Sequence, residues 1–189
     1  MKIGFIGLGN VGGKLAGSLI RNGVDTYVFD LNADFVSEKV AEGAKDGESA
    51  ANLMHICDAV ITCLPTPAAS NAVVTEMLPN VAPGKVWMEM STTDAEEVKR
   101  LSALVIEAGG EAVDCPVSGG CHRADTGNIA IYAGCTRDTF DKVLPTLTHM
   151  GRRILHVGEI GNSSTLKVMT NYLATMNLLS ICEALTVMK

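Results

Sequence analysis

The sequence predicts an α/β protein with a mostly parallel sheet, helices on both of its faces, and a long C-terminal helix. Three observations lead to this fold class. Short apolar runs alternate with helix-length segments along most of the chain, as right-handed β-α-β crossovers require. A glycine-rich turn joins the first apolar run to the first helical segment. The stretch from Asn162 to Lys189 contains neither Gly nor Pro and repeats apolar residues at helical spacing.

The predicted strands are short runs rich in β-branched and other apolar residues. The run that begins at Asp58 is continuously apolar in its middle, as expected of a strand covered on both faces. Strands are predicted at residues 2–6, 26–29, 58–64, 85–90, 112–113, 128–133 and 153–157, with a loop over 114–120.

The predicted helices follow from apolar spacing together with start and stop signals. Gly23 and Gly43 end the first two helices, Ser49 is a plausible N-cap of the third, and Pro65 and Pro67 open the fourth. Helices are predicted at residues 11–22, 34–42, 49–57, from Pro67 to about Met77, and at 94–107, 138–150 and 162–189.

The last helix would extend about 40 Å at roughly 1.5 Å per residue, which is longer than one face of a small α/β domain needs. We therefore divide the chain into a domain at residues 1–161 and a long interdomain helix at 162–189. Its far half is expected to pack on a helical domain absent from this sequence or on a partner subunit of a homo-oligomer. A frayed terminal helix is the alternative.

Composition excludes several classes of function. The chain has 189 residues, 15 Lys+Arg and 21 Asp+Glu, for a formal net charge of −6. Basic residues form nothing longer than a doublet such as Arg152-Arg153, so no nucleic-acid partner is expected. No run of about 18 apolar residues suggests a membrane span, and no signal peptide is expected. The six cysteines include no C-x-x-C pair, which favours reduced thiols in a cytoplasmic protein over disulfides or a metal site.

The segment Gly7-Leu8-Gly9-Asn10-Val11-Gly12 is a G-x-G-x-x-G between the first strand and the first helix. Its glycines permit a tight turn, close approach of the backbone to a pyrophosphate, and tight packing of helix on strand. Asp30 closes the second strand, where a carboxylate binds the adenosine ribose and repels a 2′-phosphate. Leu31 brings no positive charge, so NAD is favoured over NADP. Capping of the following helix by Asp30 is the alternative. Residues 1–161 are therefore predicted to form a Rossmann-type dinucleotide-binding domain.

Further polar segments fall at predicted strand ends, where an open parallel sheet forms its binding crevice. Leu64-Pro65-Thr66 is interpreted as a wall beside the cofactor. Ser91-Thr92 is interpreted as part of the site or as a helix cap before Asp94, and both roles are compatible. In the stretch Ser118-Gly119-Gly120, adjacent backbone N–H groups beside a hydroxyl would suit a substrate carboxylate, although an ordinary surface turn has the same composition.

Lys167 is the candidate for proton transfer. With Asn171 it occupies positions i and i+4 of the last helix, so both project from one face. A lysine whose pKa is lowered by burial donates a proton to a carbonyl oxygen as hydride arrives, or stabilises the alkoxide. A solvated surface lysine is the alternative that spacing alone leaves open.

These motifs occur in one order along nearly the whole chain, and together they resemble the β-hydroxyacid dehydrogenases, the family of 3-hydroxyisobutyrate dehydrogenase and tartronate semialdehyde reductase. The motifs are Phe5–Gly12, Leu64-Pro65, Ser91-Thr92, Asp114–Gly120 and Gly158-x-x-Gly161-x5-Lys167-x3-Asn171. The resemblance implies the following roles: cofactor binding by Gly7, Leu8, Gly9, Asn10, Val11, Gly12, Asp30, Leu64, Pro65 and Thr92; binding of a small carboxylate-bearing substrate by Ser118, Gly119, Gly120 and Asn171; and acid/base catalysis by Lys167.

The resemblance implies hydride transfer between NAD(P) and a short-chain 3-hydroxy acid or its semialdehyde. Three departures stand out: Ser163 where the family usually has Gly, Thr170 where it often has a second Asn, and no counterpart of the helical domain that closes the family's active site. One alternative is a non-catalytic dinucleotide-binding module. Another is a reductase of imines or phosphorylated sugar acids, for which Arg123 alone supplies little positive charge near residues 118–123.

Overall fold

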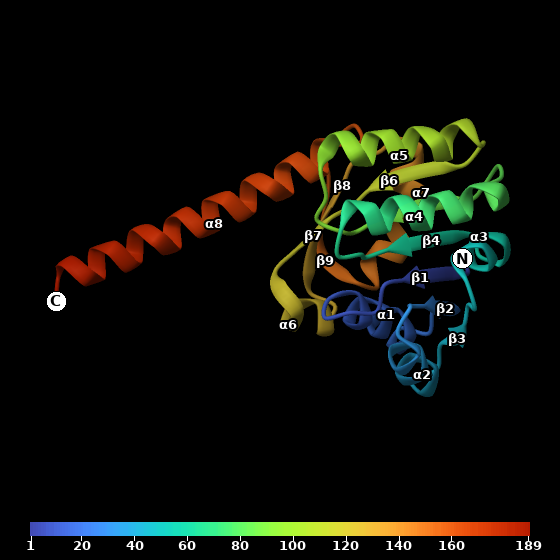
Figure 1. Ribbon diagram of the computed structural model, residues 1–189, viewed down its shortest axis with the longest axis horizontal. Helices are drawn as coiled ribbons and strands as arrows, with labels where there is room; N and C mark the ends of the chain where they lie inside the picture. The colour runs from blue at the N-terminus through green and yellow to red at the C-terminus, as the bar shows by residue number, and fades with distance from the viewer.

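The computed structural model describes residues 1–189 as two sheets, their covering helices and one projecting helix (Figure 1). The larger sheet has six parallel strands in the order β3-β2-β1-β4-β5-β6, and the smaller has three in the order β7-β8-β9. The strands of the larger sheet are β1 (Ile3–Ile6), β2 (Thr26–Phe29), β3 (Lys45–Asp46), β4 (Ala59–Thr62), β5 (Val86–Glu89) and β6 (Glu111–Asp114). Those of the smaller are β7 (Val117–Ser118), β8 (Ile129–Ala133) and β9 (Gly151–His156).

The helices lie between the strands, as predicted for β-α-β connections. They are α1 (Gly12–Arg21), α2 (Ala33–Ala41), α3 (Ala50–Ile56), α4 (Pro67–Met77), α5 (Ala95–Glu107), α6 (Gly120–Asp125), α7 (Arg137–Thr148) and α8 (Asn162–Val187), with a 3-10 turn η1 (Leu78–Asn80). Ser49 caps α3 by accepting a hydrogen bond from the Asn52 N–H, as its position before the helix predicts.

Alternating side chains of the larger sheet enter two separate cores. Ile3 and Phe5 of β1 pack with α1, α2 and the smaller sheet, whereas Ile6 packs with α3, α4 and α5. The helices of these two cores, α1 and α2 in one and α3, α4 and α5 in the other, cover opposite faces of the sheet. The prediction of helices on both faces of a mostly parallel sheet is therefore confirmed.

The structure differs from the sequence prediction mainly between residues 111 and 134. The segment predicted as a loop over 114–120 contains the end of β6 and the strand β7, which pairs antiparallel to β8. The strands predicted at 128–133 and 153–157 form the smaller sheet with β7 instead of extending the larger one. A backbone bridge between Asp114 and Gly134 joins the two sheets.

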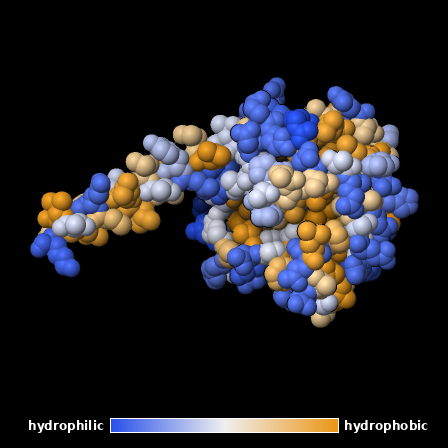
Figure 2. Space-filling view, viewed as in Figure 1, coloured by the Kyte–Doolittle hydropathy of each residue, from blue (hydrophilic) through white to orange (hydrophobic).

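Helix α8 leaves the body of the molecule after its first two turns (Figure 1). Its buried residues are Ser163, Ser164 and Lys167. Beyond them the helix exposes apolar side chains, including Tyr172, Leu173, Met176, Leu178, Leu179, Ile181 and Leu185 (Figure 2). No helix has the combination of length and hydropathy needed to cross a membrane.

A buried hydrogen bond in the larger sheet gives a direct test of its packing. Trp87, the single tryptophan, is fully buried, and its Nε1–H donates to the Thr62 hydroxyl at 3.0 Å. Because Thr62→Val leaves the indole N–H unpaired, we expect a loss of about 1–3 kcal/mol in the free energy of unfolding. Urea unfolding followed by tryptophan fluorescence measures it. Thr62→Ser, which keeps the hydroxyl, is the control, and equal stability of the two variants would contradict this packing.

Candidate active site

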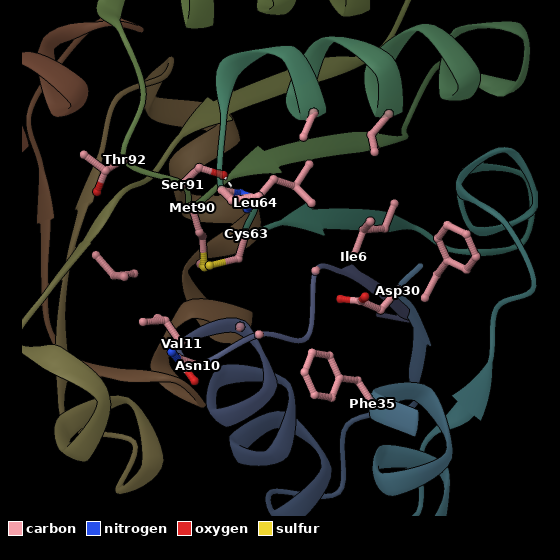
Figure 3. Close-up of a pocket in the computed structure, with 18 of the residues that line it drawn as sticks. Ile6, Asn10, Val11, Asp30, Phe35, Cys63, Leu64, Met90, Ser91 and Thr92 are labelled. Carbon is pink, nitrogen blue, oxygen red and sulfur yellow. Dashed lines mark hydrogen bonds between the residues drawn. The ribbon is translucent and has the colours of Figure 1, made fainter. Parts of the chain in front are cut away.

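A cavity of about 810 Å³ opens at the carboxyl ends of β1, β2, β4 and β5, where the crossovers of the parallel sheet diverge (Figure 3). Lys167, near the start of α8, also lines it. The cavity brings together most of the predicted site residues: Gly7, Gly9, Asn10, Val11, Gly12, Asp30, Leu64, Pro65, Thr92, Gly120 and Lys167. Leu8, Ser118, Gly119 and Asn171 do not line it.

The glycines of the first turn are required by different constraints. Gly7 has φ +92°, and a Cβ there would collide with the Cys63 carbonyl oxygen. A Cβ on Gly12 would collide with the Gly7 carbonyl oxygen. A Cβ on Gly9 would meet no atom within 4 Å. The first and third glycines therefore close the turn, and the second leaves the backbone open toward the cavity.

Four consecutive backbone N–H groups at this turn have no acceptor in the protein. The N–H groups of Gly9, Asn10, Val11 and Gly12 make no hydrogen bond, and Val11 caps α1 without a side-chain bond. The first turn of α1 contains no acidic residue. Unpaired N–H groups at the positive end of a helix bind anions, so this turn fits the pyrophosphate of a dinucleotide.

The Asp30 carboxylate organises the turn as well as facing the cavity. Its Oδ2 accepts from the Leu8 N–H at 2.7 Å, and its Oδ1 accepts from the Asn32 N–H at 2.8 Å. Asn32, and not Asp30, caps α2. The Leu8 side chain belongs to the core, which explains why this residue does not line the cavity. Leu31 is 96% exposed at the cavity rim. Asp30 can still accept further bonds from ribose hydroxyls.

Leu64 and Ser91 form one wall of the cavity, and Figure 3 shows them side by side. The Leu64 N–H donates to the Ser91 hydroxyl oxygen at 2.7 Å, and the Ser91 N–H donates to the buried Glu89 carboxylate at 2.8 Å. Helix α5 is capped by Asp94, so the capping role considered for Ser91-Thr92 is wrong. Burial raises the pKa of the neighbouring Cys63 thiol to about 12, which makes it an uncharged wall residue.

Lys167 is a buried lysine whose amine has no partner in the protein. Its side chain lines the cavity and the residue is 9% exposed. Its ammonium group makes no hydrogen bond and no ion pair with the protein, and burial lowers its pKa. This surrounding differs from that of a solvated surface lysine. Asn171, one turn further along α8, is exposed and lies outside the cavity.

The turn at Ser118, Gly119 and Gly120 reaches the cavity that Lys167 lines, through Gly120. Gly119 and Gly120 have φ +135° and +78°, and Gly120 lines the cavity. The Gly119 N–H and the Ser118 hydroxyl make no hydrogen bond with the protein. The turn thus presents unused donors next to the cavity.

Two buried carboxylates support the site without lining the cavity, and residue spacing did not single them out. Glu89 binds the Ser91 N–H, and Asp114 binds the start of α8. Their only sequence signal is an acidic residue at the end of an apolar strand.

The sheet order, the glycine turn and the cavity together define a nicotinamide-dinucleotide-binding domain of the Rossmann type, the class found in oxidoreductases. Residues 2–158 match the family described as the NAD binding domain of 6-phosphogluconate dehydrogenase, and the chain belongs to that family.

Two of the proteins that the chain resembles are dehydrogenases by name. It is 34% identical over 188 residues to 2-(hydroxymethyl)glutarate dehydrogenase of Eubacterium barkeri, covering 98% of this chain and 62% of the relative. The solved Mycobacterium tuberculosis 3-hydroxyisobutyrate dehydrogenase with L-serine superposes with a TM-score of 0.93 at 30% identity, covering 97% of this chain and 63% of that one.

A third relative has a different kind of name. The human cytokine-like nuclear factor N-PAC is 29% identical over 188 residues, covering 98% of this chain and 34% of the relative. The chain spans about three fifths of the length of the two dehydrogenases and a third of N-PAC.

The glycine turn predicts opposite outcomes for two similar substitutions. Gly9→Ala places its methyl group in open space, so we expect an unchanged unfolding midpoint but at least about ten-fold weaker NADH binding, because the methyl blocks close approach of the pyrophosphate. Gly12→Ala collides with the Gly7 carbonyl, so we expect lower stability. Thermal unfolding and NADH fluorescence titration measure both. Unaltered NADH affinity in Gly9→Ala would contradict the assigned phosphate site.

Proposed function

We propose that this chain is the cofactor-binding and proton-transferring part of an NAD-dependent dehydrogenase that oxidises short-chain 3-hydroxy acids, or reduces the matching semialdehydes. The observation that carries the proposal is the unpartnered Lys167 amine in the cavity that also receives the free N–H groups of residues 9–12. Because the chain spans about three fifths of its dehydrogenase relatives, the activity is proposed for the full-length protein.

The residues of the cavity divide into a phosphate end and a reaction end. The N–H groups of residues 9–12 would hold the pyrophosphate, and Asp30 would accept from the adenosine ribose. The wall made by Leu64, Pro65 and Thr92 would lie against the nicotinamide half. A nicotinamide ring bound there supplies or accepts the hydride.

Lys167 would move the proton. In the oxidation direction the neutral amine of Lys167 takes the proton of the substrate hydroxyl. At the same time the C–H bond of the carbinol carbon breaks, the hydrogen leaves with both bonding electrons as hydride, and the C=O bond forms. In the reduction direction the ammonium group returns that proton to the carbonyl oxygen. The lowered pKa supports this role because it increases the neutral fraction near physiological pH.

The turn at Ser118, Gly119 and Gly120 would bind the substrate carboxylate. Its unused Gly119 N–H and Ser118 hydroxyl are suitable donors, and Gly120 of the turn lines the same cavity as Lys167. Asn171 would reach the substrate from the next turn of α8, although it is exposed here. Small carboxylic acids with a hydroxyl group on the β-carbon carry both of the groups that this turn and Lys167 would bind.

NAD is the proposed cofactor in preference to NADP. Beside Asp30 a smaller cavity of about 240 Å³ is lined by Asp30, Asp46 and Glu48 and by no Lys or Arg. Negative charge on three sides disfavours a 2′-phosphate, and the exposed Leu31 offers nothing to offset it.

A non-catalytic dinucleotide-binding module is the second candidate, and the likeness to N-PAC favours it. The buried Lys167 favours the enzyme instead. A panel of 3-hydroxyisobutyrate, 2-(hydroxymethyl)glutarate, L-serine and D-glycerate, with NAD or NADP and scored by NADH or NADPH absorbance, decides between them. NADH binding without any turnover would support the module.

We also propose that the exposed apolar side chains of α8 are buried in the full-length protein, either against a helical domain of the same polypeptide or against a second copy of the chain. We propose that the protein is located in the reducing cytoplasm, where its six cysteines remain free.

Replacement of the catalytic lysine tests the mechanism. Lys167→Met should lower kcat by roughly 10²–10⁴-fold, because proton transfer loses its acid/base group, while NADH affinity stays within a few-fold. In the wild type, kcat/KM for oxidation should rise with pH through an inflection below the ordinary lysine pKa of 10.5, since the amine must be neutral. This inflection should be absent from the variant.

Lys45→Met is the matched control, because Lys45 is an exposed lysine that pairs with Asp25 and lines neither cavity. It should retain the wild-type rate and inflection. Loss of NADH binding in Lys167→Met together with activity would show that the lysine is structural and would overturn the assigned role.

Cofactor preference is tested at the exposed rim. The pair Asp30→Ser and Leu31→Arg removes one negative charge and adds a positive one, so NADPH affinity should rise by at least about ten-fold relative to NADH. Leu31→Gln alone is the control and should leave the preference unchanged. Fluorescence titration measures both cofactors, and tighter NADPH than NADH binding in the wild type would refute the assignment of NAD.

A further inference from the structure

Asp114 is a fully buried carboxylate at the carboxyl end of β6, and it binds the first turn of α8. Its Oδ2 accepts from the Gly161 N–H at 3.0 Å and from the Ser164 N–H at 2.9 Å. Its Oδ1 accepts from the Ser164 hydroxyl at 2.7 Å. The mechanism proposed above assigns this group no role.

Helix α8 has no cap of its own. The residue before it, Gly161, lies in the left-handed region at φ +93°, and no side chain at that position or acidic residue in the first turn binds the free N–H groups. Asp114 supplies the missing acceptor from a strand about 50 residues earlier in the chain. The entry of α8 into the body therefore depends on this carboxylate.

The anchored turn leads directly to the proton-transferring amine. Ser164 and Lys167 are three residues apart, so they share one face of α8, and both are buried. Past Lys167 the helix projects away from the body (Figure 1). The position of the Lys167 side chain in the cavity is thus set mainly by contacts at the start of α8, where Asp114 binds the first turn.

The same residue also fixes the proposed carboxylate-binding turn. Asp114 exchanges backbone hydrogen bonds with Gly134, at 3.0 and 2.8 Å, and the Cys115 N–H donates to the Glu89 carbonyl at 2.8 Å. Residues 116–120 follow immediately. The end of β6 therefore positions both the start of α8, which contains Lys167, and the turn at Ser118.

We infer that Asp114 is a positioning residue for proton transfer, because its carboxylate fixes the start of α8 and so sets the Lys167 amine at a defined place relative to the turn at residues 118–120. This inference rests on the proposed function of Lys167. Asp114 itself touches neither the cavity nor the amine.

Asp114 acts by positioning α8 and not through its charge. No ion pair joins Asp114 to Lys167, and both carboxylate oxygens of Asp114 accept hydrogen bonds from the start of α8. Asparagine can reproduce the pattern. Its carbonyl oxygen accepts from the two backbone N–H groups, and its NH₂ donates to the Ser164 hydroxyl, which can reverse its direction. Burial raises the pKa of Asp114, so an uncharged carboxamide suits the site. Alanine leaves all three donors unpaired.

The experiment compares Asp114→Asn, Asp114→Ala, Ser164→Ala and Thr136→Ala in the full-length protein, with 3-hydroxyisobutyrate as probe. Thr136 caps α7 away from the cavity and is the matched control for loss of a helix cap. We expect Asp114→Ala to lower kcat by roughly 100-fold with the KM for NAD nearly unchanged, because the lysine is displaced while the phosphate end is intact. Asp114→Asn should stay within about three-fold of the wild type, Ser164→Ala should fall between them, and Thr136→Ala should retain the wild-type kcat.

Hydrogen exchange of the amides at residues 161–168 provides a readout that needs no substrate. It should be faster in Asp114→Ala than in Asp114→Asn, and Thr136→Ala should leave it unchanged.

A wild-type kcat in Asp114→Ala, or equal exchange in Asp114→Ala and the wild type, overturns the inference. If Asp114→Ala fails to fold, kcat in Ser164→Ala decides, and a value equal to the wild type overturns it. If the wild type turns over none of the panel acids, the proposed function fails, and exchange alone then decides whether Asp114 fixes α8.

Discussion

The parallel pairing of β1 with β2 and β4, and of β4 with β5, is the constraint on which the rest of the structure depends. It sends the carboxyl ends of four strands to one edge, so the chain must turn there each time it leaves the sheet. The glycine turn after β1, Asp30 after β2, Leu64 after β4 and Ser91 after β5 all meet at this edge. Four segments far apart in the sequence thereby form one cavity, and the two cores beneath them hold the strand ends in place.

Carboxylates at the ends of the strands serve the fold and the site together. Asp30 binds the Leu8 and Asn32 N–H groups, which shapes the turn that precedes α1. Glu89 and Asp114 are buried at the ends of β5 and β6; Glu89 binds the segment that follows its strand, and Asp114 binds the start of α8. Backbone N–H groups that leave a sheet edge need acceptors, and a buried acidic side chain supplies two oxygens at one point. The same edge consequently contains rigid donors for a ligand and rigid acceptors for the chain.

Local patterns were sufficient to predict the strands of the larger sheet other than β3, because each of them has its own apolar run and its own turn residues. The predicted strand at 26–29 coincides with β2, and Ser49 caps α3 as expected. The two-residue strand β3 was not predicted, since only its pairing with Tyr27 and Val28 defines it. The strand β7 and the six-residue helix α6 were also missed, because Gly119 and Gly120 indicate a turn and neither element has room for a periodic pattern.

The candidate site was predictable to the extent that motifs are local. The glycine turn at residues 7–12 and Lys167 stand in recognisable spacing, and both line the cavity, except for Leu8 of the turn. The support given by Asp114 could not be foreseen, because its partners lie 47 and 50 residues further along the chain and only the folded topology joins them. The smaller sheet was merged with the larger one for the same reason, since alternation of strands and helices does not show where a sheet ends.

The central claim is that Lys167 passes a proton at the end of the cavity where the nicotinamide ring lies. A crystal structure of the full-length protein with NAD and 3-hydroxyisobutyrate tests it most directly. The account predicts that the Lys167 Nζ lies within about 3.2 Å of the substrate hydroxyl oxygen, with the substrate carboxylate on the turn at residues 118–120. An Nζ directed into bulk solvent, with another side chain on that oxygen, would contradict it.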